Sequence, residues 1–445
     1  MDLSPYLEQQ KTPLKQALKA LVSIPSVIAE DQDGFPFGKA IDDALTKALE
    51  IARDLGFRVV YDPQGYYGFA EIGSGAELVG VLGHVDVVPA GSPEQWQYPA
   101  FKATEADGRI YGRGTQDDKG PTLAALFAAK ALLEAGIPLN RRIRFIFGTD
   151  EENLWRCVRS YLQVEETPTL GFTPDSRFPL IYAEKGVLQL VLEGANDTEL
   201  RLSGGNAFNA VPDLAVYTGP RQAELMAELE RLGYESEQGE SDVRVSGKSA
   251  HAQATEEGVN AITHLAQALL GIGLRAPALE FIVNDLGADP FARAMFGECR
   301  DELTGRLKCN VGMLELGENA RLSLDLRIPV SVEKDWVVTR LQEAAQRYGF
   351  SYQEREWLAP LYMPLDHFLI QTLLKVYRQV TGDHETQPFT AGGATYARAM
   401  ANCVAFGAVF PDRPKVEHQP DEHIRLDDLY QAMHIYAQAL YELTR

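Results

Sequence analysis

The sequence predicts an α/β protein of two domains, and three observations carry this prediction. Continuous apolar runs, such as 78–82 and 142–147, are typical of strands buried on both faces, as in a parallel sheet. Helical patterns, such as 6–21 and 40–55, lie between the apolar runs. The chain has 445 residues, which is long for one domain, and from about Gly186 its pattern changes to that of a second, α+β domain.

Composition and charge restrict the function. The chain carries 42 basic and 63 acidic residues, a formal net charge of −21, which argues against nucleic acid and anionic membrane surfaces as partners. No signal peptide is visible, and no apolar run approaches the roughly 18 residues that a membrane span needs. The cysteines are scattered, so neither a zinc knuckle nor a disulfide framework is indicated. We therefore expect a cytoplasmic protein.

The strand 78–82 leads directly into the first chemical motif, which contains His84 and Asp86. These residues are two apart, so an extended backbone sends both side chains to the same side. In an open α/β sheet, sites form at the carboxyl ends of strands. An imidazole and a carboxylate held together there suit a metal ligand and the acid that orients it. A structural histidine beside a capping aspartate would explain the same pattern equally well.

The second motif places Asp117, Asp118 and Lys119 in a glycine-rich turn before an apolar helix at 123–133. One interpretation is a solvated turn whose acids cap the helix. The other is that one aspartate binds a metal ion while the second is held by nearby positive charge. This motif alone leaves both interpretations open.

The third motif follows the strand 142–147 and contains Asp150, Glu151 and Glu152 in succession. Three adjacent acids at the end of a buried strand repel one another unless cations neutralise them. As acids at a helix N-terminus they would gain at most about 1 kcal/mol each. Two metal ions are the better account, because each divalent charge offsets several carboxylates. Asp175, which follows a proline, counts only as part of this set.

With later segments, these motifs resemble the co-catalytic dinuclear metallopeptidase family of ArgE, DapE, aminoacylase and carnosinase, and look closest to the peptidase V-type dipeptidases. The resemblance covers essentially the whole chain. Each segment alone is a weak signature, whereas their order and spacing are highly specific. The later segments are 208–212, 247–251, 325–329, 392–396 and 410–412 with 418–419.

The resemblance implies a zinc-peptidase-like catalytic domain with a central mixed sheet flanked by helices, and a site for two metal ions. It implies Asp117 as the ligand that bridges the ions, Asp86 as the acid behind His84, and Glu151 as general base. It also implies a cis peptide between Asp117 and Asp118. The implied metal ligands are His84, Asp117, Glu152, Asp175 and His418.

This ligand set of two histidines and three carboxylates suits zinc, with manganese or cobalt as alternatives. The ions would lower the pKa of a bridging water. Glu151 would take the proton of that water during attack on the substrate carbonyl, and would pass it to the leaving amine.

By the same resemblance, residues 1–185 and 358–445 form the catalytic domain, and 186–357 form an inserted α+β lid domain. A lid of this length resembles the enlarged lid of peptidase V, which favours a monomer over a homodimer. Within the lid, His251 is implied to stabilise the tetrahedral oxyanion, Arg327 to clamp the substrate's terminal carboxylate, and Asn209 to contact the region of the scissile carbonyl. On sequence alone, His251 suggests a surface histidine and Arg327 a structural salt bridge.

Beyond the lid, Gly392 and Gly393 allow the backbone to approach a ligand closely, although an ordinary turn would also explain them. The sequence departs from the family pattern at Asn153 and Leu154, where relatives commonly have a small residue and glycine. It departs again at Ala394, where glycine is often found. Both departures border the implied site, so they bear on substrate preference.

These implications favour a metallopeptidase that cleaves dipeptides or very short peptides, with a small peptide as its substrate. The alternative is an N-acyl amino acid deacylase of the same family, such as an aminoacylase or desuccinylase. A non-catalytic peptide-binding protein is a weaker alternative. The other histidines match no motif and are assigned to surface or core. Two segments carry further predictions of secondary structure, a largely helical pattern at 281–308 and one buried strand at 404–410.

Overall fold

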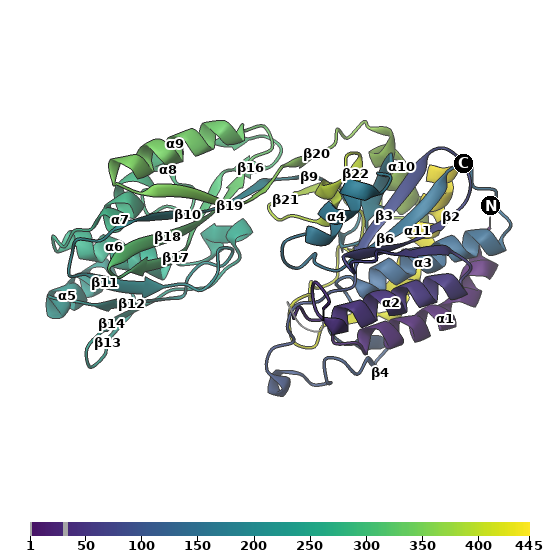
Figure 1. The fold of residues 1–445 in the computed structure, drawn as a ribbon, viewed down its shortest axis with the longest axis horizontal. Helices are drawn as coiled ribbons and strands as arrows, with labels where there is room; N and C mark the ends of the chain where they lie inside the picture. Colours follow the sequence, from purple (N-terminus) through teal and green to yellow (C-terminus); the bar gives the residue numbers. More distant parts are fainter. Residues whose placement is uncertain (1, 30–33) are drawn as a thin grey trace. The chain divides into compact units, whose positions relative to one another are not determined.

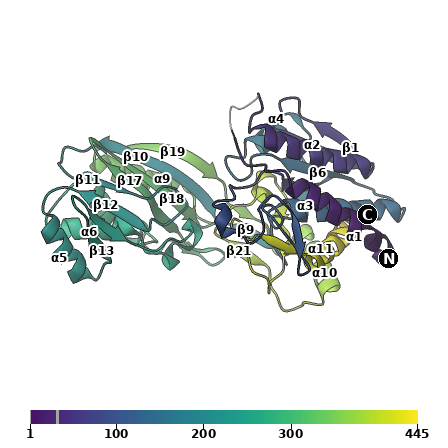
Figure 2. The same cartoon turned by 90° about the horizontal axis from the view of Figure 1, so that it is seen from below.

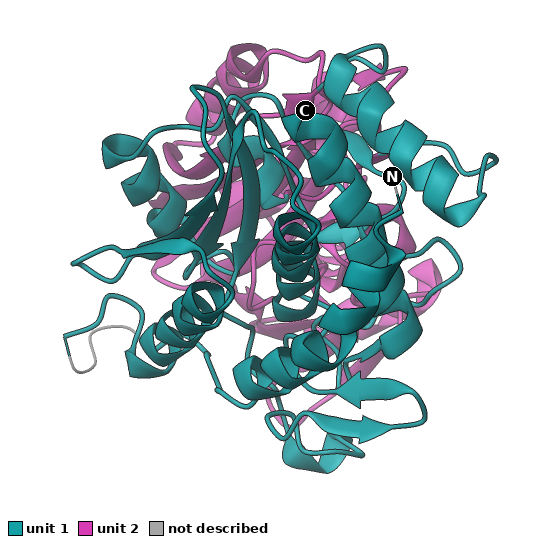
Figure 3. Ribbon diagram, turned by 90° about the vertical axis from the view of Figure 1, so that its right-hand side faces the viewer, with its two compact units in different colours: residues 1–182, 363–389, 395–445 teal, residues 183–362, 390–394 magenta. Residues whose placement is uncertain are grey.

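The computed structural model describes residues 2–29 and 34–445 and divides into two compact units (Figure 3). Unit 1 comprises residues 1–182, 363–389 and 395–445. Unit 2 comprises residues 183–362 together with 390–394. The inserted domain predicted from the sequence spans 186–357 and has no later segment.

A mixed sheet forms the centre of unit 1, in the order β1-β2-β6-β3-β7-β22-β9. Strand β3 runs parallel to both β6 and β7, and every residue of β3 is buried, as the continuous apolar run predicts. β22 continues the parallel part beside β7, whereas β1, β2 and β9 pair antiparallel to their neighbours. The strands are β1 (Arg58–Tyr61), β2 (Tyr67–Ile72), β3 (Leu78–His84), β6 (Arg142–Gly148), β7 (Leu170–Thr173), β9 (Ile181–Glu184) and β22 (Cys403–Ala405).

Helices cover both faces of this sheet. Five helices, α2, α1, α3, α11 and α10, lie side by side, and their apolar faces share one core with the sheet (Figures 1 and 2). On the other face Tyr161 of α4 packs edge-on against Tyr67 and Phe69 of β2. The helices are α1 (Ser4–Val22), α2 (Lys39–Asp54), α3 (Lys119–Glu134), α4 (Arg156–Val164), α10 (Phe368–Thr381) and α11 (Leu426–Thr444).

Smaller elements complete unit 1. They are the three-stranded sheet of β24 (His423–Arg425), β5 (Arg109–Tyr111) and β4 (Thr104–Ala106), the parallel pair β8 (Ser176–Arg177) and β23 (Ala408–Val409), and the short helices η1 (Pro93–Gln95) and η4 (Tyr396–Ala399). β20 (Leu361–Tyr362) and β21 (Phe389–Ala391) pair with β9 where the chain passes between the units.

Unit 2 is built on an antiparallel sheet in the order β13-β14-β12-β11-β17-β18-β10-β19. Alternate residues of these strands, such as Leu188, Leu190 and Leu192, point to one face and share a core with the helices. Figure 1 shows the sheet and the helices of this unit. The strands are β10 (Gly186–Ala195), β11 (Arg201–Gly204), β12 (Leu214–Thr218), β13 (Ser236–Gln238), β14 (Val243–Ser246), β17 (Lys308–Leu316), β18 (Asn319–Ile328) and β19 (Ser351–Leu358). The helices are α5 (Gln222–Leu232), η2 (Ala252–Glu257), α6 (Ala261–Gly271), α7 (Pro277–Glu280), η3 (Phe281–Asp285), α8 (Arg293–Phe296) and α9 (Lys334–Arg347).

Two predictions of secondary structure were wrong. The segment 281–308 is not largely helical: it contains η3, α8 and the small hairpin of β15 (Arg300–Asp301) and β16 (Gly305–Arg306). Gly287 and Gly297 have positive φ there, which ends helical geometry. The segment 404–410 is not one strand, because the chain turns at Gly407, where a Cβ would lie 2.4 Å from the ring of Phe178.

Within residues 2–29 and 34–445, none of the helices combines the length and the apolar character that crossing a membrane requires.

The core of unit 1 provides a test of the fold. Phe145 of β6 is fully buried and packs edge-on against Phe57, with 5.7 Å between ring centroids. We expect Phe145→Ala to lower the free energy of unfolding by about 3–5 kcal/mol, because it leaves a cavity. Val164, which is 72% exposed, serves as control, and Val164→Ala is expected to change stability by less than about 0.5 kcal/mol. Urea unfolding followed by circular dichroism measures both; equal losses would contradict this account of the core.

Candidate metal centre

The predicted metal ligands of unit 1 follow the ends of its central strands. β3 ends at His84, which lies in register with Gly148 at the end of β6. Glu151 and Glu152 follow β6, and Asp175 follows β7. Because the carboxyl ends of parallel strands meet at one edge of the sheet, these side chains converge there.

A glycine allows α3 to approach this edge closely. At Gly83 a Cβ would lie 1.9 Å from Oγ1 of Thr122 and 2.9 Å from Oδ2 of Asp118. Only a residue without a side chain fits beneath the start of α3. The loop before α3 therefore reaches the strand ends, and it brings Asp117 with it.

Asp117 lies at the centre of the cluster. Its Oδ1 is 2.9 Å from Nε2 of His84, and its Oδ2 is 3.0 Å from Nε2 of His418. Two groups of possible ligands therefore share Asp117: one with His84 and Asp175, the other with Glu152 and His418, and the ligand atoms of each group lie within 4.8 Å of one another. The peptide between Asp117 and Asp118 is cis, which confirms that expectation.

Asp86 orients the His84 ring through its Nδ1 atom. Its Nδ1 lies 3.0 Å from the backbone oxygen of Asp86 and 3.6 Å from Oδ1 of the same residue. The other carboxylate oxygen of Asp86 accepts a hydrogen bond from the backbone N–H of Glu152. A histidine whose Nδ1–H is held in this way presents its Nε2 lone pair to a metal ion.

The electrostatics of the cluster fit two cations. Burial raises the pKa of Asp175 to about 7, and it raises the pKa of Glu151 well above the usual range. Burial acts against the charge of His418, but hydrogen bonds to Asp117 and Glu152 outweigh it and raise the His418 pKa to about 11. Buried carboxylates so close together repel one another, and divalent ions would relieve that repulsion. Two imidazoles and three carboxylates are also a donor set that dinuclear zinc, manganese or cobalt sites use.

The other predicted site residues belong to unit 2. Ala210, next to Asn209, forms a β-bridge with His251, and the Asn209 carbonyl accepts from the backbone N–H of Ala252. Nδ1 of His251 accepts a hydrogen bond from the backbone N–H of Gln253 at 3.1 Å. Asn209 and His251 are therefore neighbours in the fold.

Gly392 and Gly393 pack against the same Gln253. A Cβ on Gly392 would lie 3.1 Å from Gln253 Cβ, and one on Gly393 would lie 3.0 Å from Gln253 Oε1. Nη1 of Arg327 donates to the Gly392 carbonyl at 3.1 Å. Gln253 was not among the residues predicted from the sequence, and it contacts three of them: His251, Gly392 and Gly393.

Arg327 is held by a carboxylate that the sequence analysis also missed. Asp325 is fully buried, and its two oxygens accept from Nε and Nη2 of Arg327 at 2.6 and 3.1 Å. Gln189 of the neighbouring strand donates to the same carboxylate at 2.9 Å. Residues two apart on a strand share a face, so the Asp-Leu-Arg spacing was a usable signal for Asp325.

The first departure from the family pattern borders Glu151. Leu154 is 48% exposed, and Trp155 adopts positive φ and donates from its indole to the Glu151 carbonyl at 2.8 Å. The Trp155 ring packs edge-on against Tyr396, whose ring in turn packs edge-on near His84. Trp155, which directly follows this departure, therefore supports the backbone of Glu151 through its indole N–H.

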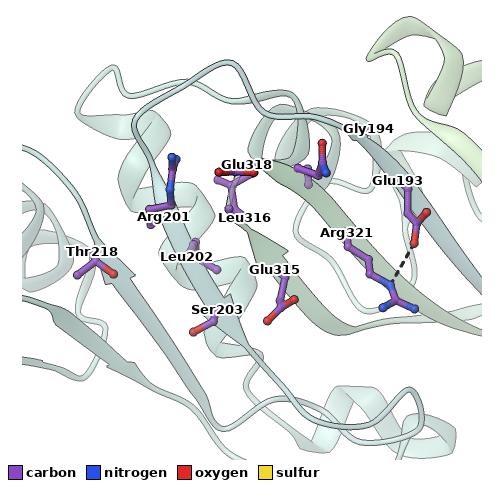
Figure 4. A pocket seen from close by; sticks show the side chains of 13 residues that line it. Glu193, Gly194, Arg201, Leu202, Ser203, Thr218, Glu315, Leu316, Glu318 and Arg321 are labelled. Atoms are coloured by element: carbon purple, nitrogen blue, oxygen red, sulfur yellow. Dashed lines mark ion pairs between the residues drawn. The ribbon is translucent and has the colours of Figure 1, made fainter.

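One cavity lies elsewhere, on the sheet of unit 2 (Figure 4). It has a volume of about 860 Å³, and charged side chains of both signs line it, among them Arg321 paired with Glu193 at 3.2 Å. It contains neither histidine nor cysteine and none of the predicted site residues. The ligand chemistry around Asp117, and not this cavity, therefore identifies the candidate site.

Comparison with known proteins agrees with this geometry. Residues 80–442 match the family described as Peptidase family M20/M25/M40. A Bacillus subtilis (strain 168) protein named "Putative dipeptidase YtjP" is 37% identical, over 93% of this chain and 92% of the relative. A similarly named Staphylococcus saprophyticus protein is 36% identical over 96% of each chain.

Solved structures show the same fold. Human carnosine dipeptidase 1 has a TM-score of 0.63 at 17% identity, over 99% of this chain and 98% of that one. The M20 family metallo-carboxypeptidase Sso-CP2 from Sulfolobus solfataricus has a TM-score of 0.61 at 20% identity, over 96% and 98%. The predicted fold class and family resemblance are confirmed. The chain belongs to peptidase family M20/M25/M40, and it is a metallopeptidase.

Proposed function

We propose that this metallopeptidase hydrolyses the peptide bond of dipeptides or very short peptides with two bound metal ions. The observation that carries the proposal is Asp117, which presents one carboxylate oxygen to each histidine of the cluster. The dipeptidase names of the two bacterial relatives and of the human structure support a dipeptide as substrate.

The chain's own residues divide between the two ions. His84 and Asp175 would hold one ion, Glu152 and His418 the other, and Asp117 both. When bound, the ions would lower the pKa of a water molecule and polarise the scissile carbonyl. Zinc fits this set best, with manganese or cobalt as alternatives.

Glu151 would serve as the general base. It follows β6 directly, next to the ligand Glu152, and the charges of His84, Asp175 and Asp117 act on its carboxyl. It would accept a proton from the attacking water and deliver it to the leaving amine. Asp86 would keep His84 in the tautomer that binds metal.

Unit 2 would supply the contacts to the substrate. Because Nδ1 of His251 accepts from Gln253, the neutral ring carries its proton on Nε2 and can donate to an oxyanion. Asn209 lies beside it and would contact the region of the scissile carbonyl. Arg327, oriented by Asp325, would bind the substrate's terminal carboxylate, and the backbone at Gly392 and Gly393 would approach the ligand. In this role, unit 2 is the lid.

Two general expectations belong to the same proposal. The enlarged inserted unit favours a monomer. Cys157, Cys299, Cys309 and Cys403 form no disulfide in the part of the chain that the structure describes, which agrees with the cytoplasm, where thiols stay reduced.

A substrate panel on metal-stripped protein tests the proposal. We expect free dipeptides to be hydrolysed only after zinc, manganese or cobalt is restored, because the water needs a metal ion to ionise at neutral pH. N-acetyl and N-succinyl amino acids are expected to remain intact. Chromatographic detection of released amino acids is the measurement. Turnover of the acylated compounds alone would assign the deacylase activity instead, and turnover of neither class would favour a binding protein.

A second test concerns Glu151. Glu151→Gln is expected to reduce kcat by roughly 10²- to 10⁴-fold, because it removes the proton acceptor. The variant should still bind two metal ions per chain, as measured by elemental analysis after dialysis. Glu152→Gln is the matched control, since it removes a metal ligand and should lower the bound metal. Full activity in Glu151→Gln would remove this residue from the mechanism.

A third test concerns Arg327. Arg327→Ala is expected to lower kcat/KM for a dipeptide by about 10- to 100-fold, since charge-assisted hydrogen bonds contribute roughly 1.5–3 kcal/mol. The same dipeptide with a C-terminal amide should lose much less, because it offers no carboxylate. Arg321→Ala on the same strand, where Arg321 is exposed and paired with Glu193, is the control. An equal loss of kcat/KM for the dipeptide and for its amide would show that Arg327 does not bind the terminal carboxylate.

A further inference from the structure

We infer that Glu422 is a positioning residue of the metal centre, which fixes the loop that carries Asp117 and, with Arg113 and Gln116, joins that loop to the one that carries His418. This inference rests on the proposed function, because it takes Asp117 and His418 as metal ligands. It concerns residues that lie behind the ligands and are assigned no role above.

Glu422 supplies a buried anion to the loop before α3. It is fully buried, immediately before β24. Its Oε1 accepts from the backbone N–H groups of Gly114, Gln116 and Asp117 at 3.0, 2.9 and 3.2 Å. Backbone N–H groups that converge in this way form a nest for an anion. The Glu422 carboxylate, from the C-terminal segment of unit 1, therefore binds the backbone of Asp117 directly.

Arg113 completes the arrangement. Only 2% of it is exposed, and its Nη1 donates to Glu422 Oε2 at 2.6 Å. The same guanidinium donates to the carbonyls of Gln419 at 3.3 Å and Pro89 at 3.4 Å. It thus joins three segments: the one that follows His84, the one that leads to Asp117, and the one that contains His418.

Gln116 adds a direct link to the His418 loop. Its Oε1 accepts from the backbone N–H groups of Val416 and Glu417 at 2.9 and 3.2 Å. His418 itself has a φ of 62°, a left-handed conformation that a residue with a side chain keeps only where its surroundings hold it. Gln116 supports the backbone just before His418, and Arg113, which is paired with Glu422, binds the Gln419 carbonyl just after it.

A second buried ion pair in unit 1 shows what a merely structural role looks like. Glu71 accepts from Nε and Nη2 of Arg144 at 2.8 and 2.6 Å, and both residues are buried. These residues face each other four positions before Gly148 on β6, away from the strand ends that carry the ligands. Glu71 therefore matches Glu422 in chemistry and burial but touches no ligand loop.

The test compares Glu422→Gln with Glu71→Gln in the full-length protein. An amide keeps the shape of Glu422 but removes its charge and places an N–H₂ group against either the backbone nest or Arg113. We expect the affinity for zinc, measured by competition with a chelator, to fall about 10- to 100-fold in Glu422→Gln. The visible absorption spectrum of its cobalt form should also change, because the ligand geometry changes. Glu71→Gln should keep wild-type zinc affinity and cobalt spectrum.

Each outcome is decisive. A folded Glu422→Gln that binds zinc and cobalt as the wild type does would overturn the inference while the proposed function stands. Equal losses of zinc in both variants would overturn it too, since the effect would then be one of general stability. If Glu422→Gln does not fold, Gln116→Met decides, because it removes only the link to the His418 loop; wild-type zinc affinity there would refute the inference. A wild-type protein that binds no zinc, manganese or cobalt would instead refute the proposed function.

Discussion

The crowding of carboxylates at one edge of the central sheet is the constraint on which the rest of unit 1 depends. Asp117, Glu151, Glu152 and Asp175 are brought together where apolar strands end, and burial raises the pKa of Asp175 and of Glu151. Such a cluster is costly unless each oxygen has a partner. Hydrogen bonds from His84 to Asp117 and from His418 to Asp117 and Glu152 offset part of that cost, and under the proposed function divalent cations would offset the remainder.

Unit 2 holds polar side chains in fixed directions on its sheet, where Asp325 and Arg327 are buried. Asp325 uses both oxygens on one side of the Arg327 guanidinium, and the Gly392 carbonyl takes a further N–H. His251 is restrained through its neighbour Gln253. Asp325 and Gln253 each lie two residues from the side chain that they hold, and the Gly392 carbonyl comes from a distant segment of the chain.

Much of the centre of unit 1 could be predicted, because β3 and β6 are continuous apolar runs that an acid or a histidine ends or closely follows, as at His84 and Glu151. The short strands of irregular segments could not: the segment from Phe281 looked helical because its apolar spacing outweighed the glycines that interrupt it. Supporting residues such as Glu422 and Gln253 were missed for another reason. Their role consists of hydrogen bonds to backbone N–H groups of distant segments, and backbone groups carry no sequence signal.

The short segment 390–394 belongs to unit 2 although the chain on both sides of it belongs to unit 1. Its Gly392 carbonyl binds Arg327, and its glycines pack against Gln253. Unit 2 is therefore built from two separate segments of the sequence. A fragment of residues 183–362 alone would lack the Gly392 carbonyl, so the Arg327 guanidinium would lose one of its hydrogen-bond acceptors.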